Sequence, residues 1–271
     1  MRKRWMRVIG VLMLIMVGSF LTASPALADK WHLDLEGGYG RYSLSWGKPN
    51  EFIRSFNSWL KDTCGVSDFE IEEMQENATL YSLGSKLTLP DPLSRLQIGL
   101  DLNYREARET YVDEYLTVPL EGGAERSVRV LTYLSDGVVF GDLILYYKFG
   151  SRLGLVPFIG AGPGYYATAV YGNYRVEEET YTPPEDWEFR YLSERFSATG
   201  FSSGYVLAAG VESSGEYIRL RLEARYHQIS KIEARFENVE NEGFPSLPFE
   251  PESSEVDISG WSISGWLVFH F

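Results

Sequence analysis

The chain holds a single cysteine, Cys64, among its 271 residues, so an internal disulfide is excluded. A protein without internal disulfides must be stabilised by a buried core or by a membrane. Positive charge is also scarce, because 25 Lys and Arg stand against 38 Asp and Glu, a formal net charge of −13. Such a balance disfavours nucleic acid as a partner, since its phosphates repel an acidic protein.

Long apolar runs are missing beyond residue 28. Before it, Arg2 to Arg7 form a basic start, Val8 to Leu21 an apolar stretch, and Ala26 to Ala28 a small-x-small cleavage site. This is the pattern of a secretory signal peptide, so residues 1–28 are predicted to be removed and residues 29–271 to form the mature protein. The apolar stretch is too short for a membrane helix, which needs about 20 such residues. We therefore expect an exported chain without an inner-membrane helix.

The last sixteen residues alternate between two faces, as residues of a β-strand do. One face is apolar and carries aromatic residues near both ends, which suits the lipid side of a strand that crosses a bilayer. Its main members are Ile263, Leu267, Phe269 and Phe271. The alternative is the buried last strand of a β-sandwich.

Similar alternation recurs in eight segments, near the length that a tilted strand needs to cross a membrane. They are 31–46, 80–89, 95–108, 128–149, 155–174, 195–211, 217–236 and 256–271.

The connections between these segments alternate in length. Three short turns rich in Gly, Pro and Ser separate four long acidic segments, 47–79, 109–127, 176–194 and 237–255. A β-sandwich does not segregate its loops in this way. The sequence therefore predicts an all-β fold, an eight-stranded antiparallel transmembrane β-barrel with short periplasmic turns and long extracellular loops.

The alternation, the terminal Phe271 and the glycines at 160, 162 and 164 in the segment Pro157 to Tyr165 resemble the small eight-stranded outer-membrane barrels, the OmpA-transmembrane, OmpX-like and OmpW-like porin-family group. The resemblance implies the outer membrane of a Gram-negative bacterium, with outer-membrane lipid and lipopolysaccharide as surroundings. It also implies assembly by the barrel-assembly machinery through the C-terminal strand, and a monomer. It implies little about activity.

The first long connection contains the only helical pattern. Apolar residues recur there at spacings of three and four, as on one face of a helix. They are Phe52, Ile53, Phe56, Trp59 and Leu60. We predict an amphipathic helix over about 50–62, capped by Asn50 and packed on the barrel rim. A helix at the membrane interface or one that docks a partner remains open.

The inward positions of the predicted strands carry charges of both signs. The predicted lumen network is Asp34, Glu36, Lys86, Asp101, Arg105, Asp142, Lys148, Arg219, Arg221, Glu223 and Arg225. Eight strands leave an interior that side chains just fill, so these charges are predicted to pair. The alternative is a narrow anion path along Arg219, Arg221 and Arg225.

Catalytic patterns are absent from the sequence. The three histidines, His32, His227 and His270, have no recognisable nucleophile and base arrangement, and no cofactor loop or metal-ligand spacing occurs. We therefore predict no enzyme, no cofactor and no metal site. Acidic runs around Glu72 and Glu178 are expected to be solvated, with binding of divalent cations as the alternative. The predicted role is envelope structure or surface interaction through the acidic loops; the alternative is a narrow channel for small solutes.

Overall fold

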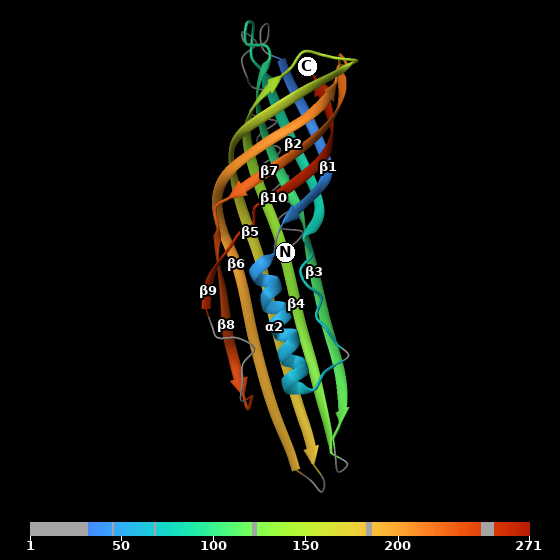
Figure 1. Ribbon diagram of the computed structural model, residues 1–271, viewed down its shortest axis with the longest axis vertical. Coiled ribbons are helices and arrows are strands. Elements are labelled where there is room, and N and C mark those ends of the chain that lie inside the picture. Colours follow the sequence, from blue (N-terminus) through green and yellow to red (C-terminus); the bar gives the residue numbers. More distant parts are fainter. Residues whose placement is uncertain (1–31, 45, 68, 121–123, 183–185, 245–251) are drawn as a thin grey trace.

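The computed structural model describes residues 32–44, 46–67, 69–120, 124–182, 186–244 and 252–271 (Figure 1). The predicted signal peptide, residues 1–28, lies outside the described residues. The elements are β1 (His32–Leu44), α2 (Gly47–Cys64), β2 (Asn77–Thr88), β3 (Leu96–Pro119), β4 (Glu125–Lys148), β5 (Leu155–Thr182), β6 (Asp186–Ser213), β7 (Ile218–Ile229), β8 (Ile232–Glu242), β9 (Glu252–Val256) and β10 (Gly260–His270). Within these ranges no helix has the length and hydropathy to cross a membrane.

Eight strands close into a ring. The order is β1, β2, β3, β4, β5, β6, β7 and β10, and β10 returns to pair with β1. Every pair in this ring is antiparallel. The predicted eight-stranded antiparallel barrel is therefore confirmed. Strands β8 and β9 lie outside the ring, because β8 pairs with the outer half of β6.

The outward surface of the barrel is an apolar belt between two rows of aromatic side chains. The first row, at the end away from the start of β1 and the end of β10, consists of Tyr39, Tyr81, Tyr104, Tyr165, Tyr205, Tyr226 and Trp261. The second row consists of Tyr147, Phe149, Tyr217, Phe269 and Phe271.

Along β10 the two rows are eight residues apart, or about 27 Å of strand at about 3.4 Å per residue. A tilt of about 40° reduces this to roughly 21 Å, near the apolar height of about 25 Å found in outer-membrane barrels. The belt is the lipid-facing surface, and the short turns lie at the end where β1 starts and β10 ends.

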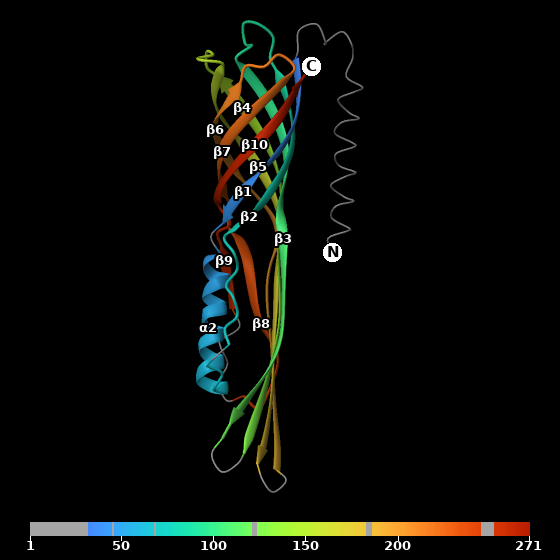
Figure 2. The same ribbon diagram turned by 90° about the vertical axis from the view of Figure 1, so that its right-hand side faces the viewer.

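The apolar face changes sides where the strands leave this belt. Within the belt Leu143 and Leu145 of β4 point outward. Val128 and Val130, which precede them on the part of β4 outside the belt, point inward and are fully buried. Strands β3 to β6 continue well beyond the ends of β1, β2, β7 and β10, as Figure 2 shows. Outside the membrane, water replaces lipid around the strands, so the apolar side chains must turn to the interior.

This extension, together with β8 and β9, forms an extracellular half-barrel with α2 along one side (Figure 2). All five apolar residues predicted for the helix are buried between α2 and the sheet. The ring of Phe52 meets Tyr174, Phe196 and Phe236 at centroid distances of 5.0, 5.9 and 5.4 Å. The helix therefore supplies the wall that the shorter strands β1, β2, β7 and β10 leave open.

Three details of the prediction are wrong. The long connections lie on one side as expected, but the described parts of segments 109–127, 176–194 and 237–255 are mostly β-strand rather than loop. The predicted strand 217–236 breaks after Ile229: β7 pairs with β10, whereas β8 pairs with β6 and β9. Asn50 does not cap the helix. The helix starts at Gly47, and the Asn50 amide instead exchanges two hydrogen bonds with the Met74 backbone, at 2.8 and 3.2 Å.

The glycines in β5 face the lumen and leave room for rings on the neighbouring strand. A Cβ on Gly160 would lie 2.7 Å from the Tyr146 ring, and a Cβ on Gly99 on the other side would lie at the same distance. Only glycine at both positions lets Tyr146 lie flat inside the barrel.

Candidate functional site

The structure places all eleven predicted lumen residues on the inner side of the strands. Nine of them are buried, and Lys148 and Arg219 are partly exposed near the short-turn end. Apart from Arg105, these side chains form three connected groups along the barrel axis.

The central group is built around Arg225 of β7. Its guanidinium contacts Asp101 of β3 at 2.5 Å, Asp142 of β4 at 3.2 Å and Glu223 at 3.0 Å. The Tyr146 hydroxyl donates to Glu223 Oε1 at 3.0 Å. One cation thus ties β7 across the lumen to the paired strands β3 and β4.

A second group lies around Glu36 of β1. Arg221 Nη1 lies 2.7 Å from Glu36 Oε2, and Arg221 Nε lies 3.3 Å from Glu223, which links the two groups. Lys86 Nζ is 3.8 Å from Glu36 Oε1 and 3.5 Å from the centroid of the Tyr146 ring. Breaking a buried pair of this kind by removing one partner typically costs about 3–5 kcal/mol.

The third group, near the short turns, contains a residue that the sequence analysis did not single out. Glu212 pairs with Lys148 at 2.7 Å and with Arg219 at 3.2 Å. The predicted strand ended at Val211, although the inward alternation of β6 continues to Glu212. At the same end His270 Nδ1 pairs with Asp34.

An aromatic layer covers the charged groups on the extracellular side. The rings of Tyr42, Phe140 and Tyr166 surround His227 at centroid distances of 5.1, 5.0 and 6.0 Å. The Tyr166 hydroxyl hydrogen-bonds to His227 Nδ1 at 3.1 Å, and Ser262 Oγ lies 3.3 Å from Nε2. A serine beside a histidine resembles a hydrolytic pair, but both side chains are at most 1% exposed, so a substrate has no access to them.

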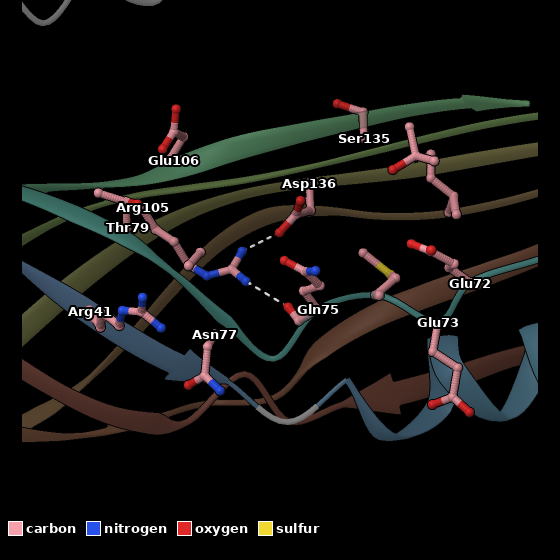
Figure 3. Close-up of a pocket in the computed structure, with 14 residues that line it drawn as sticks. Arg41, Glu72, Glu73, Gln75, Asn77, Thr79, Arg105, Glu106, Ser135 and Asp136 are labelled. Atoms are coloured by element: carbon pink, nitrogen blue, oxygen red, sulfur yellow. Dashed lines mark hydrogen bonds and ion pairs between the residues drawn. The ribbon is translucent and has the colours of Figure 1, made fainter.

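Arg105 lies closer to the extracellular rim than the other predicted lumen residues. It pairs with Asp136 of β4 and donates to the Gln75 carbonyl at 3.1 Å, as Figure 3 shows. Its guanidinium carbon lies 5.3 Å from the centroid of the Trp46 ring. Arg105 thus joins β3 to the segment that returns from α2.

A cavity of about 420 Å³ opens beside Arg105. It exists because β2 begins only at Asn77 and its pairing with β3 reaches no further than Leu80 and Arg105, where β3 has an irregularity before residue 108. We call this cavity the rim pocket (Figure 3). It is lined by Arg41, Glu72, Glu73, Met74, Gln75, Asn77, Ala78, Thr79, Arg105, Glu106, Thr110, Leu134, Ser135 and Asp136. Nothing in the sequence indicates this pocket, because it depends on strand register.

Several acidic residues of the half-barrel are held by arginines. Glu177 lies 3.6 Å from Arg129, and the buried Glu178 lies 3.8 Å from Arg126 and 3.7 Å from Arg190. Burial raises the pKa of Glu178 despite these two arginines. In the part of the chain that the structure describes, no three His, Cys, Asp or Glu side chains form a group able to hold a metal ion. Cation binding by the acidic segments stays a prediction.

The C-terminal residues singled out from the sequence line the belt. Ile263, Leu267, Phe269 and Phe271 all point outward and are between 41% and 68% exposed, as side chains in contact with lipid must be. Strand β10 pairs with β1 on one side and β7 on the other, and so closes the ring.

No protein-family model matches the chain, and no curated protein does. Solved structures similar to it include the outer membrane protein OprG from Pseudomonas aeruginosa (11% identity over 89% of this chain and 96% of that chain, TM-score 0.45). A major outer membrane protein from Thermus thermophilus (14%, 89% and 99%, TM-score 0.36) and Neisserial surface protein A (10%, 89% and 97%, TM-score 0.35) also match. The similarity agrees with the resemblance to small outer-membrane barrels read from the sequence; at these identities it concerns fold alone.

Proposed function

We propose that this chain is a non-enzymatic protein of the outer membrane that acts at the cell surface through its extracellular half-barrel, and that its lumen is closed. The carrying observation is the lumen itself, which is filled by ion-paired side chains over the height of the apolar belt. The interior of an eight-stranded barrel is just wide enough for its own side chains, so little space is left for a solute.

Two further barriers support closure. The aromatic layer around His227 lies directly outside the charged groups, and beyond it the half-barrel is packed with apolar side chains from α2 and the sheet. A solute on a straight path along the axis would have to displace all three. The surface that remains available to a partner is therefore the half-barrel and its rim, and the last strand remains the expected contact for barrel assembly.

A narrow channel is the second candidate. Buried atoms of Glu36 and Arg221 lack hydrogen bonds of good geometry to other groups of the protein, although the two side chains form an ion pair. Buried polar atoms in this condition are commonly bridged by water. A lumen that holds water is the first requirement for conduction.

Single-channel recording of the refolded barrel in a planar bilayer tests the proposal. We expect no discrete openings from the unmodified protein. The triple variant Arg219→Ala, Arg221→Ala, Arg225→Ala, if it still refolds, removes the cations that hold the network and serves as the comparison. Openings in the unmodified protein whose ion selectivity changes in the triple variant would establish the channel instead.

A further inference from the structure

The rim pocket lies just outside the lipid belt. On adjacent strands, Tyr39 of β1 faces Tyr81 of β2, with ring centroids 5.7 Å apart. Two residues further out, Arg41 faces Thr79 across the same pair of strands, and both line the pocket. Two residues of strand span about 7 Å. Tyrosine rows of this kind mark the membrane interface, so the pocket opens at the height where lipid headgroups begin.

The lining of the pocket offers both donors and acceptors. Arg41 and Arg105 supply guanidinium groups, Glu72 and Glu106 supply carboxylates, and Thr79 is one of several hydroxyl and amide side chains. A simple anion would meet four carboxylates here, and a simple cation would meet two guanidinium groups. A sugar suits such a lining, because each of its hydroxyls donates one hydrogen bond and accepts others.

The two arginines of the pocket differ in how far they are already used. Among the residues that the structure describes, Arg41 makes no hydrogen bond or ion pair, and its side chain is exposed. Arg105 is 1% exposed, and its Nε has no acceptor although its two terminal nitrogens do. A buried donor without an acceptor destabilises the folded protein, but this nitrogen has almost no exposed surface, so Arg41 is the donor that a ligand can reach.

We propose that the rim pocket binds a saccharide unit of the lipopolysaccharide around the barrel. The volume of about 420 Å³ falls in the range of about 300–1,000 Å³ that is usual for small-ligand sites. The source follows from position, since the sugars of the outer leaflet lie directly beyond the acyl chains and therefore at the pocket mouth. This inference rests on the outer-membrane location in the proposed function.

Calorimetric titration of the refolded mature chain in zwitterionic detergent tests the inference. The probes are deacylated lipopolysaccharide, the same oligosaccharide after removal of its phosphates, inorganic phosphate and Mg²⁺. We expect both oligosaccharides to bind. We expect Arg41→Gln and Glu106→Gln each to weaken that binding at least tenfold, which corresponds to about 1.4 kcal/mol. The matched control is Arg235→Gln, an exposed arginine on β8 that pairs with Glu233 and lies outside the pocket.

Heat-dependent migration in gels checks that each variant has the native barrel. Unchanged binding in both folded pocket variants overturns the proposal, as does a loss of equal size in Arg235→Gln. Binding of phosphate alone with the affinity of the phosphorylated oligosaccharide would make the pocket an anion site, and binding of Mg²⁺ alone would make it a cation site; either result also overturns it. Conductance by the unmodified protein would refute the closed lumen and leave these titrations unaffected, so the two failures can be told apart.

Discussion

At the scale of single residues, Glu194 of β6 is a buried carboxyl group inside the half-barrel. It is fully buried, and within the described residues neither of its carboxylate oxygens has a hydrogen-bond partner. Burial raises its pKa from 4.5 to about 8. The group is therefore neutral in the folded protein at neutral pH, whereas in the unfolded chain it is ionised.

This difference predicts a pH-dependent stability. The folded state binds the extra proton, so the contribution of Glu194 is fully present below pH 4.5, is lost progressively as the pH rises to about 8, and is constant above that. At about 1.4 kcal/mol per pH unit the loss is roughly 5 kcal/mol. Glu194→Gln stays neutral at every pH, so its urea midpoint is expected to fall much less than that of the unmodified protein between pH 5 and pH 8.5. An equal decrease in both proteins would assign the pH dependence to other groups.

Cys64, the last residue of α2, is predicted to be unreactive in the folded protein. Its side chain is fully buried, and burial raises the pKa of the thiol to about 12, so the reactive thiolate is almost absent at pH 8. We expect a maleimide to label Cys64 only after denaturation. As a control, Ser58→Cys on the exposed face of the same helix should react at once in the native protein. Fast native labelling at Cys64 would show that the end of the helix opens.

At the scale of elements, α2 holds the half-barrel together. Phe56 is fully buried and meets Trp59 and Tyr174 at ring centroid distances of 5.7 and 5.1 Å. Phe56→Ala is expected to cost about 3–5 kcal/mol, since it leaves a cavity in this packing.

Because the ring of eight strands does not depend on α2, the loss should be local. Limited proteolysis should cut the half-barrel of Phe56→Ala rapidly, while the barrel keeps its heat-dependent migration in gels. Ser58→Ala, on the exposed face of the helix, should be as resistant as the unmodified protein. Equal resistance of Phe56→Ala would mean that the helix is not needed to close the half-barrel.

The strands and the inner face of the barrel could be predicted because lipid outside and charge inside force a clean alternation, as in Leu96 to Arg105. The sequence did not predict the strands of the half-barrel, because their outward side chains are acidic and their inward side chains are apolar. Without knowledge of which side chains point inward, such an acidic segment is indistinguishable from a loop. Val128, Val130 and Asp142 lie on the same strand and all point to the interior. Inward side chains are charged within the membrane and apolar outside it, so the pattern changes at the membrane boundary. The rim pocket was not predictable, because it depends on where the pairing of β2 and β3 stops.

At the scale of the whole molecule, the belt, the short turns and the half-barrel fix how the protein lies in the membrane. Helix α2 lies beyond the aromatic row at Tyr39, and the turn at Ser214 lies at the opposite end of the barrel, so the short turns are expected in the periplasm and α2 outside the cell. Both Ser58 and Ser214 are exposed, so either can carry a cysteine without entering a packed region.

The expected orientation can be read in intact cells that express Cys64→Ser together with either Ser58→Cys or Ser214→Cys. A maleimide that does not cross the outer membrane should label Ser58→Cys at once, since the half-barrel projects from the surface. It should label Ser214→Cys only after the membrane is permeabilised, because the short turns face the periplasm. Labelling of Ser214→Cys in intact cells, with protection of Ser58→Cys, would show that the barrel has the opposite orientation in the membrane. That result would place the rim pocket among the phospholipids of the inner leaflet, where no lipopolysaccharide sugar could reach it.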